Sequence, residues 1–354
     1  MGMPGVSISF TEVAATAVKR GERGIVAMIV KGSIPDKNPV EVLTAADIPT
    51  TFSDDNKKQI ELALMGYVNT PKKVIVYVID EEAEDYSEAL DWLEVNKFDY
   101  LVAPTCSTDG QTTTIALWIK SMRDTGKKVK AILPETESDS EGVINFATNA
   151  LEDETGNIFK AESYCSRIAG IIAGTPLTIA CTYAPLSELV NCERLTRAEM
   201  DEAVDAGKLI VFHDGEKVKI ARGVNSFVTT NGTKGNQFKK IKIVEAMDMI
   251  YDDIIRTAED SYLGKYSNSY DNKCLLLSAI SSYFNSLIKE GILLSGTVEI
   301  DIEANRNYLL SKGADVANMS DEDVKKADTD DKVFLTAAIK ILDAIEEITL
   351  PIAI

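Results

Sequence analysis

Three stretches of the chain carry residue types that catalysis uses. His213, the only histidine in the sequence, lies beside a turn in VFHDG and could act as a base. Asp109, Gly110 and Thr112–Thr114 follow the apolar segment FDYLVAP, and loops after parallel strands hold ligands in many α/β enzymes. NGTKGNQ, residues 231–237, contains glycine and lysine but lacks the spacing of a phosphate-binding loop. We expect a locally bonded turn histidine and a solvated loop, and keep the strand-end residues as a candidate small-molecule site.

Paired carboxylates are the other source of acid–base chemistry. Asp252–Asp253 and Glu346–Glu347 are adjacent pairs, and adjacent residues on a helix point apart, so solvent-facing positions are expected rather than a carboxylate dyad. The chain has no G-x-S-x-G, G-x-x-x-x-G-K-[ST] or H-E-x-x-H motif and no EF-hand loop. The sequence therefore predicts no enzyme, with no catalytic residue, no cofactor and no metal site.

Composition narrows the class of partner. Of 354 residues, 37 are basic and 56 acidic, and the net charge of −19 disfavours nucleic acid and anionic lipid surfaces. The first basic residue is Lys19, so no signal peptide is predicted. The five cysteines are scattered through apolar sequence, as is typical of reduced, buried thiols in the cytoplasm. Residues 168–187 are uncharged, but their prolines and polar residues favour a buried helix end followed by a buried strand over a membrane span.

Short apolar runs alternate with amphipathic segments over residues 25–186 and predict an α/β domain. GIVAMIVKG, KKVIVYVID and FDYLVAPTC are nearly continuous apolar runs, as in strands that a parallel sheet buries on both faces. Residues 54–67 and TTTIALWIKSMRDTG have helical spacing, and KVKAILPE, EGVINFAT and YCSRIAGIIAG continue the alternation. At roughly 150 residues per domain, the length suggests about two domains.

Residues 187–342 have a different pattern, which predicts an α+β C-terminal domain. Thr196 and Glu199 form a capping box at the start of a helix, and a hairpin turns at Asp214-Gly215. VNSFVTT and FKKIKIV are strand-like, two amphipathic helices follow them, and GTVEIDI is a further strand. MSDEDVKKADTDD is expected as a short capped helix, whereas residues 333–342 fit either a helix or a strand.

Both ends of the chain have the alternating pattern of strands that lack a partner nearby in sequence. The first alternation ends in the turn-like segment RGERG, and Pro351 restricts the last one to the edge of a sheet. We predict arms over residues 1–24 and 343–354 that contact neighbouring subunits. Their apolar faces consist of Val6, Ile8, Phe10, Ile348, Leu350, Ile352 and Ile354.

Several segments, taken in order, resemble one known family. GEKVKIARGVNSFVTT, FKKIKIVEAMDMIYDDI and SYDNKCLLLSAISSYFNSLIKEGIL resemble the C-terminal domain of contractile tail sheath proteins of phages, defective prophages and R-type bacteriocins. SGTVEIDIEANRNYL and VFLTAAIKILDAIEEITLPIAI resemble the end of those proteins, and MPGVSISF, KKVIVYVID and ALDWLEVNKFDYLVAPT resemble their N-terminal arm and α/β domain. Only EEAEDYSEALDWLEVNK stands where larger sheaths insert domains, so the chain is similar to a minimal sheath subunit.

The resemblance implies a structural subunit that polymerises helically with itself around an inner tube and contracts to drive the tube through a target cell envelope. It implies arms that complete sheets between subunits, with tail tube, baseplate and tail terminator proteins as partners and neither nucleic acid nor membrane. It implies assembly in the bacterial cytoplasm and then a place in a phage tail or a released bacteriocin particle. The expected fold class is α/β: a mostly parallel α/β domain plus an α+β C-terminal domain, with extended β-strand arms at both termini.

The surface that contacts the tube, and two other functions, stay open. Arg306, Lys312, Lys325 and Lys326 are basic islands in an acidic protein, so we predict a tube contact there, with a merely solvated surface as the alternative. The first rival function is a small-molecule-binding α/β enzyme with its site at the strand C-terminal loops, which a ligand or turnover in the purified monomer would favour. The second is another self-assembling phage part, such as a tube or baseplate protein, although tube subunits are usually much shorter.

Overall fold

The computed structural model describes residues 17–353, so the predicted arm residues Val6, Ile8, Phe10 and Ile354 lie outside the described part. The chain divides into two compact units. The sheet unit comprises described residues 22–249 and 343–353, and the ribbon unit comprises described residues 17–21 and 250–342. The predicted boundary after residue 186 lies inside the sheet unit.

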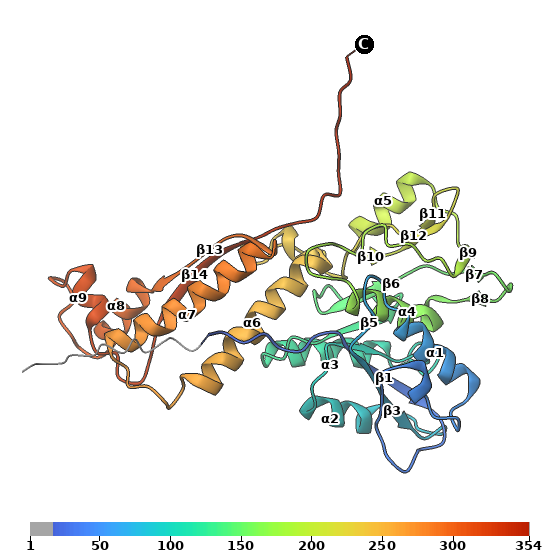
Figure 1. The fold of residues 1–354 in the computed structure, drawn as a ribbon, viewed down its shortest axis with the longest axis horizontal. Helices are drawn as coiled ribbons and strands as arrows, with labels where there is room; N and C mark the ends of the chain where they lie inside the picture. Colours follow the sequence, from blue (N-terminus) through green and yellow to red (C-terminus); the bar gives the residue numbers. More distant parts are fainter. Residues whose placement is uncertain (1–16, 354) are drawn as a thin grey trace, which may run out of the picture. The chain divides into compact units, whose positions relative to one another are not determined.

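A seven-stranded sheet forms the centre of the sheet unit, with the order β10-β6-β5-β4-β1-β3-β2 (Figure 1). Neighbouring strands pair in parallel except β2 and β3, which are antiparallel. The mostly parallel sheet confirms the predicted fold class, and β10 shows that the chain beyond residue 186 still contributes to this sheet. The strands are β1 (Ile25–Lys31), β2 (Val40–Val42), β3 (Lys73–Ile79), β4 (Tyr100–Val102), β5 (Lys130–Pro134), β6 (Val143–Phe146) and β10 (Lys208–Leu209).

Two hydrophobic cores lie on the two faces of this sheet because side chains alternate along each strand. Met28 of β1 faces the core that α1 (Asp54–Leu64) and α4 (Ala161–Ala173) cover. Ile29 faces the other core, which α2 (Ser87–Val95) and α3 (Thr112–Asp124) cover. Gly170 allows α4 to pack closely on α1, since a Cβ at this position would lie 2.1 Å from the Ala63 carbonyl oxygen.

Smaller elements complete the sheet unit and confirm two local predictions. Thr196 and Glu199 form the expected capping box at the start of α5 (Arg197–Asp205). β11 (Val211–His213) and β12 (Val218–Ile220) form the expected hairpin. The remaining elements are β7 (Leu151–Asp153), β8 (Ile158–Phe159), β9 (Leu189–Asn191), η1 (Ala45–Asp47) and η2 (Asn236–Lys239).

Three strand predictions in this unit are wrong. FKKIKIV is not a strand, because η2 is followed directly by α6 (Ile241–Ser261). The buried residues in the first half of α6 include Glu245 and Asp248, so a hydrophobicity pattern does not reveal where this helix starts. VNSFVTT forms only an isolated bridge, and residues 176–187 form turns with a single bridge at Pro185, where prolines interrupt any longer ladder.

The ribbon unit contains helix α7 (Tyr270–Lys289) packed against a two-stranded antiparallel ribbon, β13 (Leu293–Ile300) and β14 (Leu335–Ile341), as Figure 1 shows. A Cβ at Gly296 would lie 3.0 Å from the Phe284 ring, so glycine permits the close approach of ribbon and helix. The ambiguous residues 333–342 are therefore mainly strand. Between the two strands, α8 (Ile302–Ser311) and α9 (Asp321–Lys326) share a small apolar core, and α9 is the predicted short capped helix.

The five cysteines all carry free thiols, and four of them are buried, with Cys274 partly exposed. Burial raises the pKa of Cys106 and of Cys181 to about 12, so neither thiol is reactive at neutral pH. This arrangement confirms the expectation of reduced thiols, buried in four of the five cases. No helix within residues 17–353 is both long enough and apolar enough to cross a bilayer.

Candidate functional site

The loop after β4 is where a small-molecule site was considered, and polar side chains of the protein fill it. The Asp109 carboxylate accepts hydrogen bonds from the Tyr86 hydroxyl at 2.5 Å and the Thr105 hydroxyl at 2.7 Å. The Lys31 ammonium group lies 3.0 Å from the same carboxylate. Burial opposes ionisation of Asp109, but these donors outweigh it and lower its pKa. Asp109 therefore has a structural role, in which it links the end of β1 to the loop after β4.

The other polar groups of this loop also bond within the protein. Backbone N–H groups of Ser107 and Thr108 converge as they would on a phosphate, but they donate to the Glu162 carboxylate at 2.6 and 2.8 Å. Gly110 adopts φ +68° in a turn, and Thr112–Thr114 begin α3. The structure thus places the proposed enzyme residues side by side, but in structural roles. Within residues 17–353, no group of three or more His, Cys, Asp or Glu side chains is arranged to hold a metal ion.

His213 and the 231–237 loop have the local roles that were expected. The His213 Nδ1 atom accepts a hydrogen bond from the Gly215 backbone N–H at 2.9 Å within the hairpin turn. In the loop, Asn231 Oδ1 accepts from the backbone N–H groups of Thr233 and Lys234 at 2.9 and 2.8 Å. Both features stabilise turns and do not supply a reactive group.

The carboxylate pairs are not simply solvent-facing, and this corrects the prediction for one member of each pair. Asp253 is 2% exposed and accepts hydrogen bonds from the Tyr283 hydroxyl and the Gly21 backbone N–H, each at 2.7 Å. The Glu346 side chain is 9% exposed, whereas that of Glu347 is 81% exposed. One carboxylate of each pair is buried against partners from distant parts of the chain, and Glu346 and Glu347 both contact Arg222, so this second pair does not simply point apart.

A buried network of charges joins the first half of α6 to the sheet. Nζ of Lys130 on β5 lies 3.0 Å from a Glu245 oxygen and 2.7 Å from an Asp248 oxygen. Glu245 also pairs with Arg23 and accepts from the Tyr100 hydroxyl at 2.7 Å. Burial opposes ionisation of Asp248, but nearby cations outweigh it and lower its pKa.

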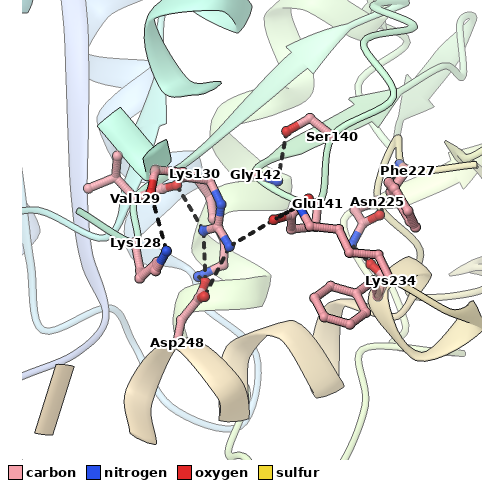
Figure 2. A network of polar contacts seen from close by, with 12 residues as sticks. Lys128, Val129, Lys130, Ser140, Glu141, Gly142, Asn225, Phe227, Lys234 and Asp248 are labelled. Carbon is pink, nitrogen blue, oxygen red and sulfur yellow. Dashed lines mark hydrogen bonds and ion pairs between the residues drawn. The ribbon is translucent and has the colours of Figure 1, made fainter. Parts of the chain in front are cut away.

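Arg123 extends this network toward the 231–237 loop. Its guanidinium donates two hydrogen bonds to Asp248, at 2.9 and 3.0 Å, and lies 3.6 Å from Glu141. Glu141 in turn lies 2.8 Å from Lys234. Figure 2 shows Asp248 rising from α6 toward Val129 and Lys130, with Glu141 beside Lys234. Every charged member has an opposite charge beside it, as burial requires.

The described part of the C-terminal arm, residues 343–353, belongs to the sheet unit and is an extended chain (Figure 1). Residues 342–353 form neither helix nor strand, and Ile348, Leu350 and Ile352 are 83%, 73% and 77% exposed. These side chains follow each other at every second position, so on an extended chain they lie on one face. The arm therefore presents an apolar strand face that the described part of the subunit does not cover.

The ribbon of β13 and β14 has two strands within the described residues and is largely exposed along β14. Two-stranded ribbons are marginally stable alone, and their outer edges carry backbone groups that can pair with another strand. Helix α7 supports one face of this ribbon through Phe284. The ribbon is therefore held in place by α7, and a further β-strand could pair with the outer edge of β13 or β14.

The four basic residues predicted to contact the tube all lie on or near α8 and α9, each beside an acidic partner. Arg306 donates to the backbone oxygens of Val316 and Met319 and to Asp321, which holds the segment between the two helices in place. Lys312 lies 2.9 Å from Asp330, and Lys325 and Lys326 lie 3.5 and 4.0 Å from Glu322. The side chains of Lys312 and Lys326 are more than half exposed, so they are accessible to a partner protein.

Comparison with known proteins gives two matching family models. Residues 81–226 match the phage tail sheath protein central domain, and residues 233–354 match the phage tail sheath C-terminal domain. The chain is 37% identical over 356 residues to the tail sheath protein of Clostridium phage phiCD119, covering 99% of this chain and 98% of that protein. It is 26% identical to the XkdK protein of the phage-like element PBSX of Bacillus subtilis, over 83% of this chain and 72% of that protein.

Solved structures share the fold. The sheath tail protein from Desulfitobacterium hafniense has a TM-score of 0.69 and 21% identity, covering 84% of this chain and 94% of that one. The helical sheath of the anti-feeding prophage in its contracted state has a TM-score of 0.71 and 14% identity, covering 100% of this chain and 99% of that one. The family models and the full-length relative make this a structural protein rather than an enzyme: the chain belongs to the phage tail sheath protein family.

Proposed function

We propose that copies of this chain polymerise helically around an inner tube and then rearrange into a shorter sheath that drives the tube through a target cell envelope. Family membership makes the chain a component of a phage tail or a phage-tail-like particle. The anti-feeding prophage relative forms a helical sheath with a contracted state, and its chain aligns with this one over its whole length. Larger contacts between subunits in the shorter state would supply the free energy for contraction.

The observation that carries this proposal is the exposed apolar face of the C-terminal arm. Ile348, Leu350 and Ile352 each forgo about 1.5–3 kcal/mol of burial while they remain in water. A partner strand in another subunit would bury them. The outer edges of β13 and β14 offer backbone pairing for such a strand. An arm-to-ribbon contact repeated head to tail generates an open helical polymer when its rotation does not close into a ring, and the helical sheath of the anti-feeding prophage favours that form.

The same role is proposed for the N-terminal arm, with Val6, Ile8 and Phe10 as its apolar face. Two described residues near the end of this arm are held in the ribbon unit: Arg20 pairs with Glu290, and the Lys19 backbone N–H donates to the Thr257 hydroxyl at 3.2 Å. The arm thus begins from a defined point on its own subunit.

Further partners of the polymer are also proposed. Arg306, Lys312, Lys325 and Lys326 are proposed to face a tail tube protein, with the exposed lysines making the contact and Arg306 holding α8 and α9 in place. Baseplate and tail terminator proteins would bind the two ends of the polymer. Assembly would take place in the bacterial cytoplasm before the particle is released.

Ile352→Asp tests the role of the arm, with Ala353→Asp as a matched control on the opposite face of the extended chain. Burying an unpaired charge is costly, so Ile352→Asp should raise the protein concentration needed for helical tubes by at least about tenfold. Ala353→Asp should change it by less than about twofold. Sedimentation and negative-stain micrographs measure this concentration, and equal behaviour of the two variants would contradict the proposal.

A further inference from the structure

Glu346 lies at the root of the C-terminal arm and has several partners in the sheet unit. Its Oε1 accepts a hydrogen bond from the Thr182 hydroxyl at 2.6 Å, and its Oε2 accepts from Nε and Nη2 of Arg222 at 3.1 and 2.9 Å. Nζ of Lys240 lies 3.2 Å from the same Oε2. We call Thr182, Arg222 and Lys240 the Glu346 clamp. Burial opposes ionisation of Glu346, but the clamp outweighs it and lowers its pKa, so the carboxylate is charged at neutral pH.

The clamp residues come from three separate segments of the sheet unit and are themselves fixed. Thr182 lies in the turns after α4, Arg222 follows β12, and Lys240 precedes α6. The Thr182 hydroxyl accepts a hydrogen bond from the Gly223 backbone N–H at 3.0 Å, which orients its own hydrogen toward Glu346. Lys240 also pairs with Asp343 at the start of the arm. The carboxylate therefore enters a preformed site.

The apolar side chains next to Glu346 in the sequence are exposed rather than buried. Ile345 and Ile348 are 86% and 83% exposed. A cavity of about 550 Å³ is lined by both of these side chains and by Ile179 and Tyr183, so the apolar groups of the arm root do not pack tightly against their own unit. Polar contacts, rather than a hydrophobic contact, place the arm on the subunit.

We propose that Glu346 is a positioning residue for assembly: the clamp fixes the point at which the arm leaves the subunit and directs residues 348–352 to the ribbon of a second copy of this chain. This inference rests on the proposed role of the arm as an intersubunit strand. An arm with a fixed root loses less conformational freedom when it pairs with its neighbour than an arm that is free from residue 343 onward. The clamp also fixes direction, because Arg222 donates two N–H groups to Oε2 while Thr182 donates to Oε1, so each carboxylate oxygen has its own partner.

Glu346→Gln tests the proposal, with Glu347→Gln as the matched control. The two variants each remove one negative charge, at adjacent positions, but the Glu347 side chain is 81% exposed and forms an ion pair with Arg222 at 3.2 Å. Sedimentation should show that Glu346→Gln raises the concentration needed for assembly by at least about tenfold, and Glu347→Gln by less than about twofold. The thermal midpoint of dilute Glu346→Gln should fall only slightly below that of Glu347→Gln, because the clamp contributes some stability but the arm packs little apolar surface on its own unit.

A distance measurement on the dilute monomer separates positioning from a loss of stability. Nitroxide labels at Thr349→Cys and Lys217→Cys, in a chain that also carries Cys274→Ser, place both probes on the sheet unit while the four remaining cysteines are buried. Double electron–electron resonance should give a narrow distance distribution in the parent chain and in Glu347→Gln. The Glu346→Gln distribution should be clearly broader, since the root of the arm is released.

The possible outcomes distinguish this inference from the proposed function. If Ile352→Asp prevents assembly while Glu346→Gln assembles like the parent chain, the arm is an intersubunit strand but the clamp does not position it. If Ile352→Asp also assembles normally, the proposed role of the arm itself fails. An equal distance distribution in Glu346→Gln, or a large drop in its thermal midpoint, would overturn the positioning role and leave a residue that only stabilises the fold.

Discussion

At the scale of single residues, Lys130 is the cation between two buried carboxylates of the sheet unit. Its side chain is 4% exposed, and both Glu245 and Asp248 lie within 3.0 Å of its ammonium group. Burying such charges costs desolvation free energy, which their attraction roughly offsets, so the network specifies a geometry more than it adds stability. Without Lys130, Glu245 keeps Arg23 and Asp248 keeps Arg123, but the two buried carboxylates lose the cation that they share, which is far more costly than losing a surface pair.

Lys130→Met should therefore lower the free energy of unfolding by about 3–5 kcal/mol, because Glu245 and Asp248 would each lose a buried cation. Urea denaturation of the dilute monomer, followed by circular dichroism, measures this loss. Lys72→Met is the control within the same unit, since Lys72 pairs with Glu22 at the surface and its loss should hardly move the midpoint. A loss below about 1 kcal/mol for Lys130→Met would contradict the role assigned to the network.

Residue-level predictions succeeded where the partner is close in sequence. The Thr196–Glu199 capping box and the His213 turn contact both involve residues within three positions of each other, so local pattern is sufficient. Asp253 and Glu346 were placed in solvent because their partners come from remote segments, such as Gly21 and Arg222. A charged residue that breaks an otherwise apolar alternation, as Glu346 does within residues 345–350, is a signal that could have marked the clamp.

At the scale of elements, α8 and α9 form a small platform that carries the basic residues. Arg306 bonds to two backbone oxygens and Asp321, so it is needed to shape the platform. Lys325 and Lys326 lie 3.5 and 4.0 Å from Glu322, and Lys326 Nζ also lies 5.8 Å from the centroid of the Tyr270 ring. These weak surface contacts could be exchanged for an acidic partner on a tube protein. The lysines therefore give the cleaner test of a tube contact.

Reversal of both Lys325 and Lys326 to Glu should weaken co-sedimentation of sheath with tube by at least about tenfold, because the contact would become repulsive. Assembly of the sheath alone should stay within about twofold of the parent chain. Reversal of Lys57 and Lys58 on α1 is the matched control for added negative charge. If sheath–sheath assembly suffers equally, or if tube binding does not change, these lysines do not form the tube contact.

Most elements were predictable from periodicity, and the failures have identifiable causes. Strands β1 and β3 are continuous apolar runs, and α7 has a clear apolar stripe, so each was found. The start of α6 was missed because Glu245 and Asp248 occupy core-facing positions. β14 was ambiguous because its side chains are mostly exposed, and only pairing with β13 makes it a strand.

At the scale of the whole molecule, the chain passes between the sheet unit and the ribbon unit after residues 21, 249 and 342. The fold class was predictable because both kinds of pattern, buried parallel strands and amphipathic helices, are local. The division between the two units at residue 249 could not be predicted from these local patterns. It depends on long-range contacts, because β10 and the buried charges of α6 join residues 187–249 to the sheet. The apolar arm was also predicted from the sequence. The contacts that hold Glu346 at its root were not, because Thr182, Arg222 and Lys240 come together only in the folded chain.

Helical reconstruction of tubes formed by the full-length protein tests the central claim most directly, because it shows which ribbon each arm joins. We expect continuous density for residues 348–352 as a strand paired with β13 or β14 of a neighbouring copy, with Glu346 still bound by Thr182, Arg222 and Lys240 of its own subunit. Arms folded back on their own subunit within the tubes would contradict it, as would a protein that stays monomeric at high concentration.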